Sequence, residues 1–200
     1  MEGPPDAALV AASLADPSVF GTIFDRHAST LHRYLVRRLG PDDADAMVGE
    51  VFRIAFEKRA TFDCSRESAR PWLYGIATNL VAKHRRREAR RITATARLAA
   101  QRFASPSEDE DRTADAIDAR QLWPLVAEAV AGLPEPERDA LILHVWEGLS
   151  YEEVAAALTV PVGTVRSRLN RARGRLRELR TATGGQQGHS AGRGAGRIGS

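Results

Sequence analysis

The residues best suited to chemistry in this sequence lie between positions 150 and 179, where two helical patterns are joined by a proline-containing turn. Ser150 can cap the first helix, because Glu153 follows at the spacing of a capping box. The residue before Pro161 is disfavoured in helical geometry, so a second helix is expected from about Val162. The apolar residues of this second helix form one stripe on a 3.6-residue period and are Val165, Leu169, Ala172, Leu176 and Leu179.

The opposite side of this second helix is polar and rich in arginine. A short helix, a turn and a helix with a polar, basic outer face is the form that enters a DNA major groove. Residues on the first turns of such a helix reach base edges, while the remaining arginines hold phosphates. An ordinary basic surface helix is the alternative. The predicted DNA-contacting residues are Thr164, Arg166, Ser167, Arg168, Asn170 and Arg171.

A second basic region begins at Pro71, which suits the first turn of a helix. The predicted helix carries Trp72 and Tyr74 early and ends in the run KHRRREARR at 83–91, in which six of nine residues are Lys or Arg. Basic and aromatic residues on one rigid element suit a nucleic-acid backbone and an unstacked base. A charge run that is simply solvated is the alternative.

Before both of these regions in the chain, residues 42–59 predict a helix with acids at its start and Lys58 and Arg59 at its end, which favours the helix dipole at both termini. The side away from the apolar residues carries Asp45, Gly49, Glu50 and Arg53. From the pattern alone, this is a solvated charged face.

Composition excludes several classes of function. The chain is 43% hydrophobic with a net charge of +3, and no apolar run approaches the ~20 residues needed to span a membrane. Cys64 is the only cysteine, so an internal disulfide and a cysteine-based zinc site are excluded, although redox sensitivity of Cys64 itself is not. The histidines and acids show no metal or catalytic spacing. We therefore expect no enzyme activity, no cofactor, no small-molecule substrate and no membrane insertion.

The pattern predicts an all-α protein of two small helical domains, the C-terminal one a four-helix domain with a helix-turn-helix. The segment Ser105–Asp118 holds six acids and one arginine and almost nothing apolar, which is typical of a flexible linker. The predicted parts are an N-terminal extension at 1–18, a helical domain at 19–100, an acidic linker at 101–119, the helix-turn-helix domain at 120–180 and a disordered glycine-rich tail at 181–200.

Three stretches of this sequence resemble the sigma-70 family, and specifically the two-domain extracytoplasmic function (ECF) sigma factors, over about residues 19–180. DADAMVGEVFRIAFEKRATFD at 43–63 is similar to region 2.2, and PWLYGIATNLVAKHRRREARR at 71–91 to regions 2.3 and 2.4. LPEPERDALIL at 133–143 with GLSYEEVAAALTVPVGTVRSRLNRARGRLREL at 148–179 is similar to region 4. In the family, these regions bind the polymerase clamp, melt and read the −10 promoter element, and read the −35 element.

The resemblance implies roles for individual residues. The arginine-rich helix from about Val162 corresponds to the helix that reads the −35 element in the family. Loop 61–70 corresponds to the family's loop that captures a flipped-out base. The sequence departs from common family residues at Ala46, Gly49 and Lys83. The resemblance implies polymerase contacts at Asp45, Glu50, Phe52 and Arg53, and −10 contacts at Trp72, Asn79, Lys83, His84, Arg86 and Arg87.

The partners implied by the resemblance are core RNA polymerase, promoter DNA and an anti-sigma factor, in the cytoplasm. The acidic linker either threads towards the polymerase cleft or is a plain tether. The competing interpretation is a helix-turn-helix DNA-binding transcriptional regulator that acts without core polymerase. That regulator would bind specific duplex DNA tightly alone, whereas a sigma factor would bind weakly until polymerase is added.

Overall fold

The computed structural model describes residues 3–100, 126 and 128–185, and for 94–100 and 179–185 the backbone alone. The described residues are helical and contain no strand, which confirms the all-α prediction. In chain order the elements are α1 (Asp6–Ala12), η1 (Pro17–Val19), α2 (Phe20–Leu39), α3 (Pro41–Lys58), η2 (Arg59–Thr61), α4 (Arg70–Ala100), α6 (Glu135–Leu141), η3 (Ile142–Trp146), α7 (Tyr151–Leu158) and α8 (Val162–Gly185).

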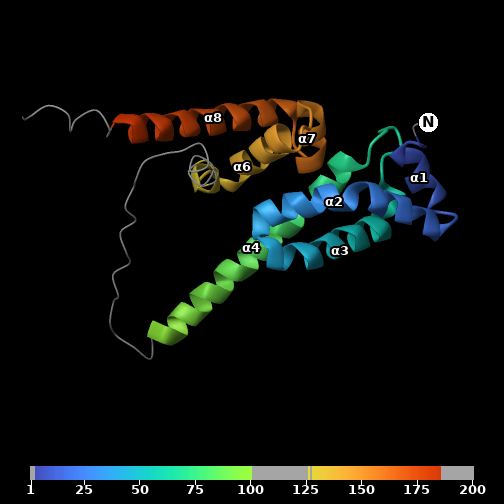
Figure 1. The fold of residues 1–200 in the computed structure, drawn as a ribbon, viewed down its shortest axis with the longest axis horizontal. Helices are drawn as coiled ribbons and strands as arrows, with labels where there is room; N and C mark the ends of the chain where they lie inside the picture. The colour runs from blue at the N-terminus through green and yellow to red at the C-terminus, as the bar shows by residue number, and fades with distance from the viewer. Residues whose placement is uncertain (1–2, 101–125, 127, 186–200) are drawn as a thin grey trace, which may run out of the picture.

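The first four α-helices form one packed unit, with α2 and α3 side by side and α4 crossing them (Figure 1). Gly40 makes the turn between α2 and α3 at a φ of 91°, a conformation that favours glycine, and Pro41 opens α3. At the centre of this unit the rings of Tyr34 and Tyr74 pack edge to face at 5.2 Å, and both are fully buried. The Tyr34 hydroxyl lies 2.8 Å from Thr78 Oγ1, so its polar atom is satisfied.

The second unit consists of α6, η3, α7 and α8, and it contains the expected helix-turn-helix. Ser150 accepts a hydrogen bond from the Glu153 N–H, and the Glu153 carboxylate accepts one from the Ser150 N–H, which confirms the predicted capping box. Thr159 ends α7 in the left-handed conformation at φ 53°. The chain thus turns sharply between α7 and α8, and α8 starts at Val162 as predicted.

A π-helical segment, η3, changes which residues of the helix before the turn face inward. The Glu147 N–H donates to the Ile142 carbonyl, five residues back. The wider turn rotates the following side chains, so Leu143 is buried and Val145 is 56% exposed. The apolar spacing of residues 135–147 predicts a regular helix with Leu141, Ile142, Val145 and Trp146 facing inward, and this prediction is wrong at Val145.

Two helices continue past the ends of their clearest sequence patterns. The helix that starts at Arg70 continues without a break to Ala100, and in Figure 1 its second half extends away from the bundle. The last helix continues to Gly185, so residues 181–185 are helical and do not belong to a disordered tail. The predicted linker at 101–119 and the rest of the predicted tail, from 186, lie outside the described residues.

The two units pack against each other mainly through α4 and α7. Gly75 of α4 is fully enclosed there, and a Cβ atom at this position would lie 2.6 Å from the Ala157 carbonyl oxygen. Glu147, a buried carboxylate of the second unit, accepts a 2.5 Å hydrogen bond from the Tyr74 hydroxyl and pairs with Arg37. Arg70 donates to the Glu147 main-chain oxygen at 2.7 Å. The two units therefore share polar contacts as well as apolar packing.

Candidate nucleic-acid interface

Helix α8 divides cleanly into a buried stripe and an exposed basic face. Val165, Leu169 and Ala172 are fully buried against the rest of the second unit, as the spacing predicted. Of the other two residues of the predicted stripe, Leu176 is half-buried and the side chain of Leu179 lies outside the described part of the chain. On the other side, Arg166 and Asn170 are exposed, and their side chains form no hydrogen bond or ion pair within the described residues. Of the other predicted residues on this face, Ser167 and Arg171 are exposed, whereas Thr164 and Arg168 are half-buried.

One carboxylate from α6 holds two arginines of this face. Glu137 is 6% exposed, and its two oxygens lie 3.1 Å from Arg171 Nε and 3.0 Å from Arg175 Nε. Both guanidinium groups remain about half exposed, so they present positive charge to solvent while the buried Glu137 carboxylate fixes their orientation. Sequence reasoning missed Glu137, because its partners are 34 and more positions away.

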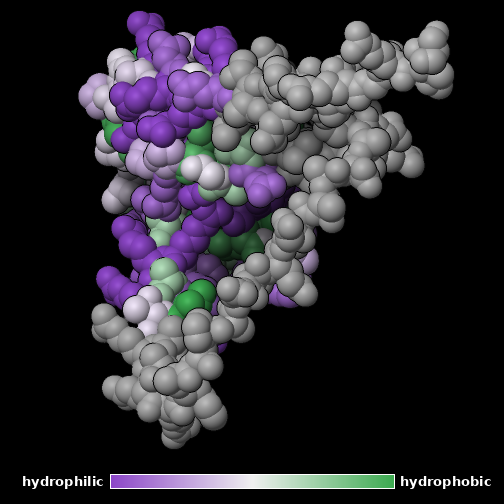
Figure 2. Space-filling view, turned by 90° about the vertical axis from the view of Figure 1, so that its left-hand side faces the viewer, coloured by the Kyte–Doolittle hydropathy of each residue, from purple (hydrophilic) through white to green (hydrophobic). Residues whose placement is uncertain are grey.

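The basic part of α4 is also accessible. Asn79, Lys83, Arg86 and Arg87 are exposed, while His84 is half-buried with Nε2 3.4 Å from a carboxylate oxygen of Asp43. Where the described residues are visible in Figure 2, most of the side chains are hydrophilic. The exposed basic residues of α4 can meet a polyanion without rearrangement of the core.

Trp72 has a different position from the other predicted −10 residues. It is half-buried, and its ring packs against the buried ring of Phe62 at 5.1 Å. Phe62 starts the loop between η2 and α4, whose residues 63–67 are exposed. Trp72 is therefore both a packing residue for this loop and an accessible aromatic surface beside it.

The exposed face of α3 carries an internal ion-pair ladder. Arg53 donates to Glu50 at 2.7 and 2.8 Å and to Glu57 at 2.5 Å. The hydrogen bonds from Arg53 lower the pKa of Glu50, and Lys83 of α4 contributes to the same shift. The ionised Glu50 and Lys83 are thus electrostatic neighbours, and the faces of α3 and α4 adjoin.

Phe52 does not belong to this exposed face. Its side chain is only 6% exposed, and its ring packs 4.8 Å from that of Phe24. The polymerase contact that the resemblance implies at Phe52 stays a prediction, and in this structure the apolar ring lies in the core between α2 and α3. Phe24, which is 44% exposed, is the accessible aromatic residue of this pair.

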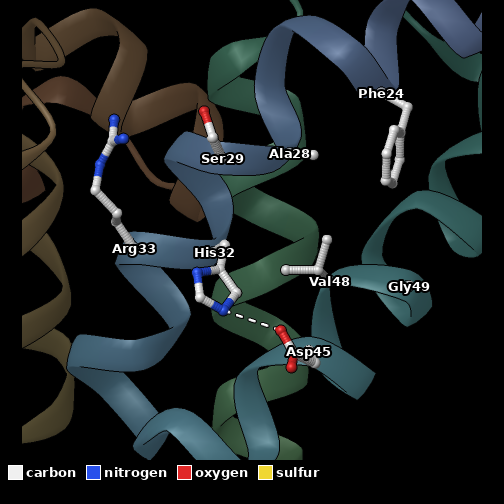
Figure 3. A pocket seen from close by; sticks show the side chains of 8 residues that line it. All are labelled: Phe24, Ala28, Ser29, His32, Arg33, Asp45, Val48 and Gly49. Atoms are coloured by element: carbon white, nitrogen blue, oxygen red, sulfur yellow. Dashed lines mark ion pairs between the residues drawn. The ribbon is translucent and has the colours of Figure 1, made fainter.

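A pocket of about 620 Å³ opens between α2 and α3 beside Phe24 (Figure 3). Its rim carries an ion pair between His32 Nε2 and the exposed Asp45 carboxylate at 3.0 Å. Gly49 contributes to the opening, since no atom lies within 4 Å of where its Cβ would be. The lining residues are Phe24, Ala28, Ser29, His32, Arg33, Asp45, Val48 and Gly49.

Buried charges accumulate where the two units meet. Arg38 is 4% exposed, and Asp139 lies 2.5 Å from its guanidinium, in contact but not aligned for a hydrogen bond. Burial raises the pKa of Asp139 despite the attraction of Arg38. Burial and the positive charge of Arg38 lower the pKa of Arg85 and of Arg138. Spacing could not reveal these residues, because the cluster joins distant parts of the chain.

The described residues contain no group of three or more His, Cys, Asp or Glu side chains arranged to hold a metal ion. None of their helices is long and apolar enough to cross a bilayer.

Comparison with known proteins gives concordant results for both units. The sigma-70 region 2 model matches residues 23–91, and the sigma-70, region 4 model matches residues 125–176. The ECF RNA polymerase sigma-E factor of Haemophilus influenzae is 32% identical over 163 residues, which cover 79% of this chain and 85% of the relative. The sigma-E factor of Escherichia coli K12 is 33% identical over 166 residues, covering 79% and 84%.

Solved structures agree with these sequence relationships. The structure of CnrH in complex with the cytosolic domain of CnrY superposes with a TM-score of 0.62 at 26% identity, covering 88% of this chain and 97% of that one. The sigma factor RpoE in complex with the anti-sigma factor NepR from Bartonella quintana has the same fold, with a TM-score of 0.59 over 81% and 96%. With both helical units and the sequence identity in agreement, the chain belongs to the ECF RNA polymerase sigma factors of the sigma-70 family.

Proposed function

We propose that this protein binds core RNA polymerase and directs it to promoters, reading the −35 element with α8 and opening and reading the −10 element with α4 and the loop before it. The observation that carries this proposal is the presence of two accessible basic helix faces on two units, with the charged face of α3 beside one of them. One DNA-binding unit would suffice for a simple regulator. Promoter opening needs a second surface for unpaired bases.

The exposed residues of α8 and α4 suit different parts of the DNA. On α8, Arg166 and Asn170 have no competing partner among the described residues, so they are the best candidates for base edges in the major groove. Arg171 and Arg175, oriented by Glu137, suit phosphate contacts. On α4, Lys83, Arg86 and Arg87 suit the backbone of the non-template strand. Extrusion of a base costs a few kcal/mol, which these contacts and the polymerase must offset.

The exposed face of α3 is the proposed polymerase contact. Asp45, Glu50 and Arg53 project into solvent there, and Arg53 is already paired with Glu50 and Glu57. A polymerase helix that binds here must either accept this ladder intact or exchange partners with it. The half-exposed ring of Phe24 and the neighbouring pocket extend the surface with apolar area.

We expect the two units to separate when both promoter elements are bound. The positions −35 and −10 place the two elements about 25 base pairs apart, which corresponds to about 85 Å of B-form DNA. The contact between α4 and α7 must therefore open when both elements are engaged. A molecule closed in this way is expected to bind promoter DNA weakly until polymerase separates the two units.

We further propose an anti-sigma partner and a cytoplasmic location for the protein, and no catalytic activity of its own. CnrH and RpoE, which share the fold, were solved as complexes with CnrY and with the anti-sigma factor NepR. A partner of this class would cover the surfaces for polymerase and DNA.

Run-off transcription with purified core polymerase, with and without this protein, on a library of upstream DNA from its own genome tests the proposal. We expect discrete start sites that depend on the protein and share −35 and −10 elements. No initiation, together with tight specific duplex binding by the protein alone, would support a regulator that acts without polymerase. Hydrolytic or transfer activity of the purified protein would contradict the absence of catalysis.

A further inference from the structure

The loop between η2 and α4 is anchored at its two ends and exposed in between. At its start, Phe62 is buried against Trp72. At its end, Ala69 is fully buried, and its carbonyl accepts the first hydrogen bond of α4 from the Leu73 N–H at 2.9 Å. Residues 63–67 between these anchors are solvent-exposed.

Within the exposed part, the loop has little to hold its position relative to the helices. The Asp63 carboxylate accepts hydrogen bonds from Ser65 N–H at 3.1 Å and Ser65 Oγ at 2.7 Å, and pairs with Arg66 at 3.2 Å. These contacts shape the turn locally, but they all lie within the loop. Its position therefore depends on the two buried ends and on one contact of Glu67 with the N-terminal helix.

The N-terminal helix supplies the second anchor. Asp6, the first residue of α1, is 6% exposed, and its Oδ2 accepts a hydrogen bond from the Ala69 N–H at 2.9 Å. A longer hydrogen bond of 3.4 Å runs from the Ala7 N–H to the Glu67 carbonyl. Figure 1 shows α1 beside this loop. A residue 63 positions earlier in the chain thus fixes the point where the loop becomes α4.

Two side chains of α2 hold the Asp6 carboxylate in its charged form. His27 Nε2 lies 2.7 Å from Oδ2, and Arg26 Nη1 lies 3.1 Å from Oδ1. Burial by itself would raise the pKa of Asp6, but the hydrogen bonds from Ala69, His27 and Arg26 outweigh it, so the pKa is lowered. A buried anion with partners on both oxygens is held in one geometry.

We propose that Asp6 is a positioning residue for promoter opening, whose carboxylate ties α1 to the end of loop 62–69 and holds that loop ready to receive an unstacked base of the −10 element. The inference rests on the proposed function for the identity of the base. The contact between Asp6 and the end of the loop is a feature of the structure and does not depend on that function. It gives the N-terminal extension, to which the sequence assigned no role, a part in reading DNA.

The expected consequence is a loss of preorganisation. When only a fraction of molecules holds the binding-competent loop, the apparent affinity for the base falls by that fraction. If Asp6→Asn leaves about a tenth of the loops correctly placed, binding of the −10 strand weakens roughly tenfold. Contacts of α3 with polymerase and of α8 with duplex DNA do not involve the loop and keep their affinities.

The test compares Asp6→Asn and Asp6→Ala with the control Asp16→Asn. Asp16 is also an N-terminal aspartate that accepts from a backbone N–H, but its partner is Ser18, and it does not touch the loop. Cys64, the only cysteine of the chain, is exposed within the loop and takes a nitroxide label at one defined site. Electron paramagnetic resonance of the labelled full-length protein then reports loop mobility without DNA or polymerase.

Unlabelled holoenzymes of the same variants are titrated with a fluorescent single-stranded oligonucleotide carrying the non-template −10 sequence found by run-off transcription. We expect a more mobile label and about tenfold weaker oligonucleotide binding in Asp6→Asn. Asp6→Ala should lose more, because asparagine keeps an oxygen that accepts the Ala69 N–H. Asp16→Asn should match the wild type in both measurements.

Three results separate the possible explanations. An immobile Cys64 label in both Asp6 variants would overturn the link between Asp6 and the loop. An equal loss of core-polymerase and −35 duplex binding would make Asp6 a residue of general stability and would also overturn the proposal. Failure of wild-type holoenzyme to prefer the −10 oligonucleotide over a scrambled one would contradict the proposed function instead, since the label measurement needs no DNA.

Discussion

The packing of Gly75 against α7 predicts that two similar glycine-to-alanine substitutions have opposite effects, one destabilising the contact between the units and the other stabilising its helix. Gly75 and Gly49 are both interior helix glycines, in α4 and α3. A Cβ at Gly75 would lie 2.6 Å from the backbone oxygen of Ala157, whereas a Cβ at Gly49 would meet nothing within 4 Å. Gly75→Ala should therefore disrupt the contact between the units, and Gly49→Ala should only stabilise its helix.

The magnitudes follow from the same geometry. Replacing an interior helix glycine by alanine stabilises by about 0.5–1 kcal/mol. For Gly49→Ala this should raise the melting temperature by about 1–4 °C in a chain of this size. Gly75→Ala gains the same amount within α4, but the backbone of α7 must withdraw until the 2.6 Å separation reaches an ordinary contact distance. Overpacking of this kind costs about 1–3 kcal/mol, so the net effect on the contact is unfavourable.

Small-angle X-ray scattering and thermal unfolding of the full-length protein test this prediction together. We expect a larger radius of gyration for Gly75→Ala, with unchanged helix content by circular dichroism, and an unchanged radius for Gly49→Ala. Glu147→Leu should open the same contact, because it leaves the buried Tyr74 hydroxyl without its acceptor at a cost of about 1–3 kcal/mol. Equal stabilisation by both alanine substitutions, with no change in radius, would refute the reasoning.

Three further predictions concern the candidate surfaces and the N-terminal anchor. Asn170→Ala should remove about 1–3 kcal/mol of −35 discrimination in competitive run-off transcription, and unchanged promoter preference would exclude a base contact. Glu50→Lys should weaken core-polymerase binding with the melting temperature nearly unchanged, since Glu50 is exposed; normal binding would exclude this face. Because folding lowers the pKa of Asp6, its stabilisation is present above its ordinary pKa of 3.8 and is lost as the pH falls through the lower folded value. The stability difference between wild type and Asp6→Asn should therefore shrink on acidification below pH 3.8, and a difference that stays constant would contradict the assignment.

Predictions from local pattern succeeded where the physical cause is also local. The capping box at Ser150 and Glu153 spans three residues, and the buried stripe on α8 follows from one helical period. The pattern failed at Val145, because a π-turn shifts the helical register in a way that apolar spacing does not show. At Phe52 the ring fills the core against Phe24, and the polymerase contact that the resemblance implies there stays a prediction.

The sequence by itself determined the all-helical class, the helix-turn-helix, the two basic faces and the resemblance to sigma factors, since short-range periodicity, capping and charge carry each of these. Only the tertiary structure decided that the two units close on each other through Gly75 and Glu147, and that Asp6 holds the loop at Ala69. The partners in these contacts are 63 to 82 positions apart in the sequence. Such pairs depend on how whole helices pack, and buried polar groups then take the partners that packing brings within reach.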